Sequence, residues 1–151
     1  MDIRKATEYD YAGLCDLFYN NQMSVPLWEE IKEYGIVAVE GDVVVGYVWA
    51  ITGNCNTAFI DHLVVNKEYR VERNDGMGRA KLAVDICAKL IADLISIGVT
   101  KLTTTVMDNI YGPALAKTYK SIGFEFVNCL GLASGDSVDI LKAMGDRTNG
   151  R

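Results

Sequence analysis

A loop with two glycines is the first stretch of this sequence whose residue types could do chemistry. It reads Gly76-Met77-Gly78 and lies in the segment 73–80, between an expected strand and an expected long helix. Glycine lets the backbone turn sharply and approach a ligand where a Cβ atom would collide. The first N–H groups of the helix lack intrahelical partners, and the helix dipole adds partial positive charge there. Such a loop is suited to binding a phosphate group.

The spacing of these glycines excludes two common phosphate-binding motifs. The sequence contains no GxxxxGK[ST] run, so a Walker-type nucleoside triphosphatase is excluded. Position 81 is lysine, so the loop is not a GxGxxG motif, and no such fingerprint follows the first expected strand. A lone GxG also occurs in glycine turns that only cap a helix. The function of the loop is therefore judged from what surrounds it.

A second candidate is a pair of polar residues inside an apolar strand. The run 58–65 is apolar except at Asp61 and His62, an interruption that is typical of a strand facing a cleft. Strict alternation along the strand predicts that Asp61 shares a face with Leu63 and Val65 and that His62 points the other way. His62 is the single histidine of the chain, the residue type that ordinarily titrates nearest neutral pH.

Hydrophobic periodicity predicts the elements that position these residues. We expect an α/β (α+β) fold in the order βααβββαβαββ, with a central mixed sheet of about seven strands and helices on both faces. The expected strands are 3–6, 36–39, 43–49, 58–65, 101–106, 124–132 and 138–143. The expected helices begin at Thr7, at Pro26, at the glycine loop and at Pro113.

Composition limits the class of protein further. The chain has 151 residues, of which half are apolar, and this suits one domain over 1–151 with its own core. A net charge of −5 without a Lys/Arg-rich block argues against nucleic acid as a partner. We expect neither a secretory signal nor a membrane span. The cysteines Cys15, Cys55, Cys87 and Cys129 form no CxxC pair, so we expect buried thiols in a cytoplasmic protein and no metal site.

The segment around the glycine loop resembles the Q/R-x-x-G-x-G/A signature of the GNAT-type N-acetyltransferases. Here it reads Arg73-x-x-Gly76-x-Gly78 and lies between the fourth expected strand and the third expected helix, as in that family. Other segments that resemble the family follow in its order: Met1 to Phe18, Gly41-Asp42 with Val45-Gly46-Tyr47, Leu63-Val64-Val65 with Glu68-Tyr69-Arg70, and 116–124. The resemblance covers nearly the whole chain and implies the GNAT-like fold.

The resemblance also implies acetyl-CoA as the cofactor and the residues that would bind it. The pantetheine arm would lie between splayed fourth and fifth strands and pair with the backbone of Leu63 and Val65. The pyrophosphate would rest on the loop and on the start of the following helix, at Arg73, Asp75, Gly76, Met77, Gly78, Arg79 and Ala80. Either arginine is available to neutralise the phosphates.

Acetyl transfer needs an unprotonated amine, donors for the oxyanion and a proton for the departing thiolate. The resemblance implies that Tyr119, four residues before Gly123, protonates the thiolate. Asp61 is the expected base, acting directly or through water, and His62 is the alternative.

Three departures from the family pattern accompany these assignments. Lys67 replaces the usual proline after the fourth strand, and about three extra residues, 71–73, lengthen the loop. Gly112 stands where many members carry an asparagine that contacts the cofactor.

The expected function is transfer of an acetyl group from acetyl-CoA to a primary amine of a small molecule or a protein. The amine acceptor is expected to contact residues 20–28 and 131–136. The excess of acidic residues in the chain favours a cationic acceptor. An unpaired last strand would permit a homodimer. Two alternatives stay open: a non-catalytic acyl-CoA-binding or regulatory domain of the same fold, and a nucleotide-binding module that uses the same loop.

Overall fold

The structure is a computed structural model that describes residues 1–54, 56–70, 80–105, 116–117 and 120. Its sheet has the strand order β1-β2-β3-β4-β5 and is antiparallel except between β4 and β5, which are parallel. The strands are β1 (Asp2–Lys5), β2 (Gly35–Glu40), β3 (Val43–Thr52), β4 (Thr57–Val65) and β5 (Lys101–Thr104). The helices are α1 (Tyr11–Asn20), α2 (Trp28–Ile31) and α3 (Ala80–Ser96), with 3-10 turns η1 (Glu8–Asp10) and η2 (Lys67–Arg70).

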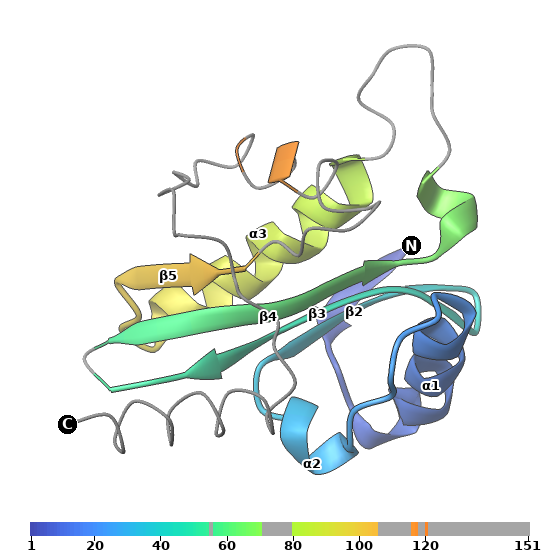
Figure 1. The fold of residues 1–151 in the computed structure, drawn as a ribbon, viewed down its shortest axis with the longest axis horizontal. Helices are drawn as coiled ribbons and strands as arrows, with labels where there is room; N and C mark the ends of the chain where they lie inside the picture. Colours follow the sequence, from blue (N-terminus) through green and yellow to red (C-terminus); the bar gives the residue numbers. More distant parts are fainter. Residues whose placement is uncertain (55, 71–79, 106–115, 118–119, 121–151) are drawn as a thin grey trace, which may run out of the picture.

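Helices cover both faces of the sheet, as Figure 1 shows: α1 and α2 lie on one face and α3 on the other. Each face therefore has its own apolar core. The core under α3 includes Val48, Ile60, Ile86, Leu90 and Leu94. The core under α1 and α2 includes Leu14, Phe18, Tyr47, Trp49 and Val64.

The expected α/β class and the expected elements up to residue 105 are confirmed, with changed bounds. The helix expected at Thr7 begins as the 3-10 turn η1, where the Asp10 carboxylate accepts hydrogen bonds from Arg4 at 2.7 Å and from the Thr7 amide at 2.8 Å. The helix expected at Pro26 begins at Trp28, because Leu27 is still extended at φ −69° and ψ 145°.

The C-terminal elements of the expected fold lie mostly outside the described residues. The expected strands 124–132 and 138–143 are not among them, so the described sheet has five strands. Residues 116, 117 and 120, which fall in the helix expected at 113–122, are helical.

Candidate active site

A β-bulge in β4 interrupts the pairing of this strand with β3. Val48 of β3 pairs with Leu63, whereas Ala50 pairs with Ile60, so Trp49 alone faces the two residues Asp61 and His62. The extra residue shifts the alternation of side chains along the strand. As a result Ile60 and Leu63, three positions apart, both pack into the core under α3.

The bulge places Asp61 and His62 together on the face that carries α1 and α2. Oδ2 of Asp61 lies 3.1 Å from Nδ1 of His62. Strict alternation predicts Asp61 on the face of Leu63 and Val65, and this prediction is wrong because alternation takes no account of a bulge. The predicted orientation of His62, opposite to that of Leu63, is confirmed.

Aromatic rings hold the His62 imidazole in place. It is stacked on the indole of Trp49, with 4.7 Å between ring centroids and 7° between the ring planes. Phe18 of α1 lies 6.4 Å away, centroid to centroid. Nδ1 is buried and has no aligned hydrogen-bond partner in the described part of the chain, although 39% of the side chain is exposed. That exposure therefore belongs to other atoms of the side chain.

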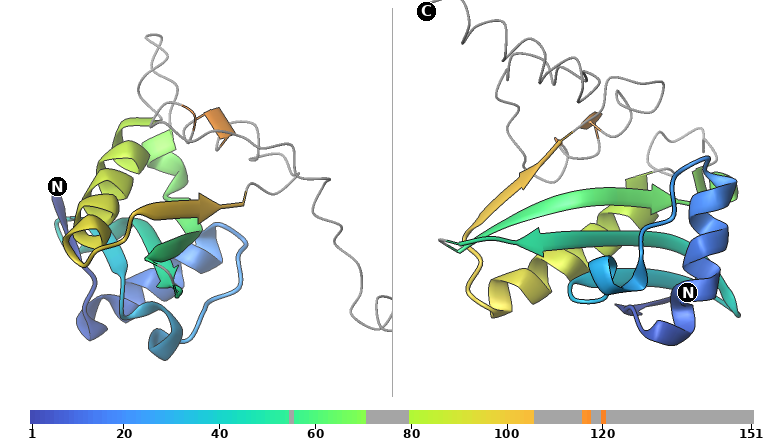
Figure 2. Two further views of the ribbon diagram at one scale, coloured as in Figure 1. Left: turned by 90° about the vertical axis from the view of Figure 1, so that its left-hand side faces the viewer. Right: turned by 60° about the horizontal axis from the view of Figure 1, so that its bottom comes forward.

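Strands β4 and β5 separate at the same place. Their pairing runs from Thr57 opposite Lys101 to Ile60 opposite Thr104, where β5 ends. From Asp61 to Val64, β4 is paired, among the strands that the structure describes, with β3 alone. Figure 2 shows β5 diverging from β4 along its length. The end of this pairing and the bulge therefore fall at the same point of β4.

In the described part of the chain, helix α3 runs from Ala80 to Ser96, so the long helix that the sequence predicts after the glycine loop is confirmed. The prediction that the start of this helix binds a phosphate depends on residues of the loop before it. The other predicted cofactor-binding residues of the loop, Arg73, Asp75, Gly76, Met77, Gly78 and Arg79, lie outside the described residues, as does Tyr119.

The segment that leads from β4 towards this loop is fixed to the sheet. In η2 the Tyr69 hydroxyl donates a hydrogen bond to the Glu40 carboxylate at the end of β2, and this bond raises the pKa of Tyr69. The Tyr69 ring packs against the core under α3. The sequence signal for the turn is Asn66, whose side-chain oxygen accepts the Glu68 amide at 3.2 Å.

A hollow at the end of α1 falls within the segment expected to meet the acceptor. It is lined by Tyr19, Asn20, Gln22, Met23 and Ser24. Met23 also packs into the core under α1 and α2. Phe18, the neighbour of Tyr19, contacts His62, so hollow and imidazole lie on the same face of the sheet. Sequence reasoning missed Phe18 and Trp49 as residues of this site.

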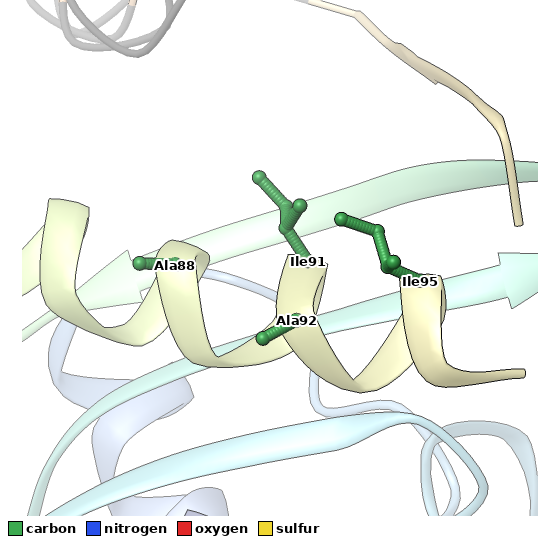
Figure 3. A pocket seen from close by; sticks show the side chains of 4 residues that line it. All are labelled: Ala88, Ile91, Ala92 and Ile95. Atoms are coloured by element: carbon green, nitrogen blue, oxygen red, sulfur yellow. The ribbon is translucent and has the colours of Figure 1, made fainter.

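An apolar groove on α3 is a different feature. Ala88, Ile91, Ala92 and Ile95 line it, and their side chains line one stretch of the helix in Figure 3. None of these four residues is polar or titratable, and α3 covers the face of the sheet opposite Asp61 and His62. The groove therefore takes no part in the candidate active site.

The comparisons with known proteins identify the fold. An acetyltransferase of the GNAT family from Staphylococcus aureus Mu50 is 14% identical in sequence to this chain, and the two structures superpose with a TM-score of 0.69. The match covers 88% of this chain and 89% of that protein. The aminoglycoside 6'-N-acetyltransferase from Enterococcus faecium is 18% identical, with a TM-score of 0.65, and the match covers 89% of this chain and 90% of that protein. The aminoglycoside N-acetyltransferase AAC(6')-Iy, solved in complex with CoA, is 15% identical, with a TM-score of 0.67, and the match covers 89% of this chain and 99% of that protein.

These similarities show that the chain has the fold of the GNAT acetyltransferases, and the expected fold family is confirmed. No protein-family model matches the sequence, and no curated protein matches it. Among the described residues, no helix combines the length and the apolar character that crossing a membrane requires.

Proposed function

We propose that this chain is an N-acetyltransferase that transfers the acetyl group of acetyl-CoA to a primary amine of a small molecule or a protein. The observation that carries the proposal lies in β4. At one point of this strand the pairing with β5 ends and the bulge brings Asp61 and His62 onto one face. A strand opening beside two groups able to accept a proton is what acetyl transfer from an extended thioester requires.

Acetyl-CoA suits the residues around this opening. Its pantetheine arm is extended and carries two amide groups, so it can lie along β4 as a further strand would, and we assign Leu63 and Val65 to this contact. The start of α3 at Ala80 suits the pyrophosphate, because the first N–H groups of a helix lack intrahelical partners. The glycine loop, with Arg73 or Arg79, completes the proposed binding site.

The proposed chemistry divides between two proton transfers. When bound, acetyl-CoA supplies an electrophilic thioester carbonyl. Asp61 and His62 serve the amine side, where the attacking nitrogen must lose a proton. Tyr119 is proposed to donate a proton to the departing thiolate. Overall, an ammonium and acetyl-CoA give the acetylated amine, free CoA and one proton.

The hollow at the end of α1 is the proposed entrance for the acceptor. A protein of the same fold, AAC(6')-Iy, is solved with the bisubstrate analogue CoA-S-monomethyl-acetylneamine, which joins CoA to an amine-bearing sugar. Exposed carboxylates on α1, in α2 and just beyond it, at Asp16, Glu29, Glu30 and Glu33, favour a cationic acceptor through steering. We place the protein in the cytoplasm, since Cys15 and Cys87 are free thiols and burial raises the pKa of Cys87 to about 12.

Thiol release from acetyl-CoA tests the proposal. A panel of aminoglycosides, polyamines, amino acids and peptides is added in turn, and free CoA is measured with a thiol reagent. We expect at least one amine to accelerate release, and we expect Tyr119→Phe to slow it by about 10²–10⁴-fold. If CoA binds in calorimetry but no amine accelerates release, the chain is an acyl-CoA-binding domain. If ATP or NAD displaces CoA, the result supports the alternative that the chain is a nucleotide-binding module.

A further inference from the structure

We propose that His62 is the group that takes the proton from the attacking amine, with Asp61 and Trp49 as the residues that position it. This assignment rests on the proposed acetyl transfer and extends it, because it gives His62 the role of the base and its neighbour Asp61 the role of a positioning residue. Sequence reasoning favours Asp61 as the base. The geometry at the bulge points instead to a histidine held from one side by a carboxylate and from below by an indole.

The position of Asp61 determines which nitrogen of His62 carries the proton. Nδ1 is buried and lies 3.1 Å from Oδ2 of Asp61, close enough for a hydrogen bond but out of line for one. The last torsion of an aspartate is broad, so a small rotation of the carboxylate aligns the two atoms. Hydrogen bonds of this kind are often loose before substrate binds and tighten in the complex. With the proton on Nδ1, the lone pair of the neutral ring is on Nε2.

Burial then determines which nitrogen meets the amine. The His62 side chain is 39% exposed while Nδ1 is buried, so the exposed part of the side chain excludes Nδ1. Nε2 lies across the ring from the Cβ-bearing side and is the nitrogen left for a ligand on this face. The Asp61 side chain is less exposed, at 30%, and its Oδ2 is already directed at the imidazole.

The surroundings of His62 stabilise the imidazolium that forms when it takes a proton. The Trp49 centroid is 4.7 Å away, within the distance at which the face of an indole attracts a cation. The Asp61 carboxylate adds an opposite charge. The described rings nearby are uncharged: Phe18 of α1 lies 6.4 Å from the imidazole, and Tyr47 of β3 lies 5.5 Å from Trp49, centroid to centroid.

The proton transfer balances as follows. An N–H bond of the amine breaks and its proton bonds to Nε2 of His62, while the nitrogen forms a bond to the acetyl carbon. The carbon–sulfur bond breaks, and the sulfur takes the proton that Tyr119 is proposed to donate. An ordinary imidazole, with a pKa of about 6.5, accepts a proton from an amine more readily than an ordinary carboxylate, with a pKa of about 4. The imidazolium returns its proton to solvent, and Tyr119 takes a proton back from solvent, so both residues regain their starting states.

The tautomer of His62 tests the arrangement without any acceptor. His62 is the single histidine of the chain, so a nitrogen-15 spectrum of the imidazole contains one ring. At alkaline pH we expect the proton on Nδ1, and in Asp61→Ala we expect it on Nε2. Asp85→Asn is the matched control, because Asp85 is an exposed carboxylate on α3. A wild-type ring that carries its proton on Nε2 overturns the proposal.

The pH profile of the reaction tests the catalytic role. With the best amine of the panel, we expect His62→Gln and His62→Asn to lower kcat/KM by about 10²–10⁴-fold and to leave the affinity for CoA unchanged. We also expect the acid limb of the kcat/KM profile in both variants to keep only the part that comes from protonation of the amine itself, and the wild-type profile to persist in Asp85→Asn. Variants that are folded by circular dichroism and keep the wild-type acid limb overturn the role of His62. A wild type that acetylates no amine instead contradicts the proposed function itself, whatever the tautomer.

Discussion

The imidazole of His62 lies parallel to the indole of Trp49, with 4.7 Å between their centroids. The two rings belong to neighbouring strands, and Trp49 faces His62 because the bulge gives it two partners in β4. The same bulge begins where β5 ends its pairing with β4. The stacked ring pair and the proposed opening for the cofactor thus lie at the same point of β4.

Tryptophan fluorescence should report this ring pair. The chain has two tryptophans, so Trp28→Phe leaves Trp49 as the single indole. We expect His62→Gln in this background to change the emission, because it removes the ring that is stacked on the indole. The measurement compares the emission spectra of the two proteins at one pH.

Asp85→Asn in the same background is the control, because Asp85 is an exposed carboxylate on α3. It should leave the emission unchanged. An emission spectrum that His62→Gln does not alter would contradict the stacked arrangement.

Two strand glycines should respond in opposite ways to alanine. A Cβ atom at Gly35 of β2 would lie 2.3 Å from the Tyr47 hydroxyl and 2.9 Å from the Ile31 carbonyl, two groups that are hydrogen-bonded to each other. We expect Gly35→Ala to lower the free energy of unfolding by about 1–3 kcal/mol, because the buried tyrosine must move. Urea unfolding of the variant measures the change.

Gly46 of β3 is the matched control. Its added Cβ would meet side chains of Ala38, Ile86 and Leu82 at 3.5 to 3.6 Å, which is ordinary contact. We expect Gly46→Ala to be neutral or to stabilise by about 0.4–1 kcal/mol, since it restricts the unfolded chain. Equal losses at both positions would contradict the packing of Tyr47 under Gly35.

The buried Asp10 carboxylate should make stability depend on acid pH. The hydrogen bonds from Arg4, at 2.7 Å to each carboxylate oxygen, lower the pKa of Asp10, and bonds from Thr7 add to this effect. A lowered pKa in the folded state contributes stability above the unfolded value of about 4, and that stability is lost as the pH falls through the folded value.

We therefore expect Asp10→Asn to lower the free energy of unfolding by about 1–3 kcal/mol at neutral pH. The difference from wild type should shrink steadily below about pH 4, where the wild-type carboxylate also becomes neutral. Urea unfolding across this range measures both curves, with Asp85→Asn as an exposed control. A difference that does not change with pH would contradict the charge-assisted link between β1 and η1.

Periodicity and turn residues predict most of the described fold. The β-branched runs and the turn at Gly41 define the β2–β3 hairpin, and Gly41 adopts the positive φ of 61° that such a turn uses. The helical spacing of Cys87, Leu90 and Leu94 predicts α3, and all three are fully buried. These signals are local, so the sequence contains them completely.

The bulge could not be predicted from alternation, because it depends on how β4 pairs with β3. One signal was nevertheless present. With helices on both faces, alternation would send either Asp61 or His62 into an apolar core, and a buried unpaired polar group is costly. A bulge that brings both onto one face removes this conflict. Phe18 and Trp49 were missed as site residues because their sequence pattern matches ordinary core positions.

The transfer of a labelled acetyl group tests the central claim most directly. Wild-type protein is incubated with acetyl-CoA carrying carbon-13 in its acetyl group and with the amine panel. Mass spectrometry identifies the labelled amine, and a thiol reagent counts the CoA released. We predict that one class of amine gains the label in an amount equal to the CoA released. CoA binding without any labelled amine, and with the same slow thiol release whether or not amines are present, would contradict acetyl transfer.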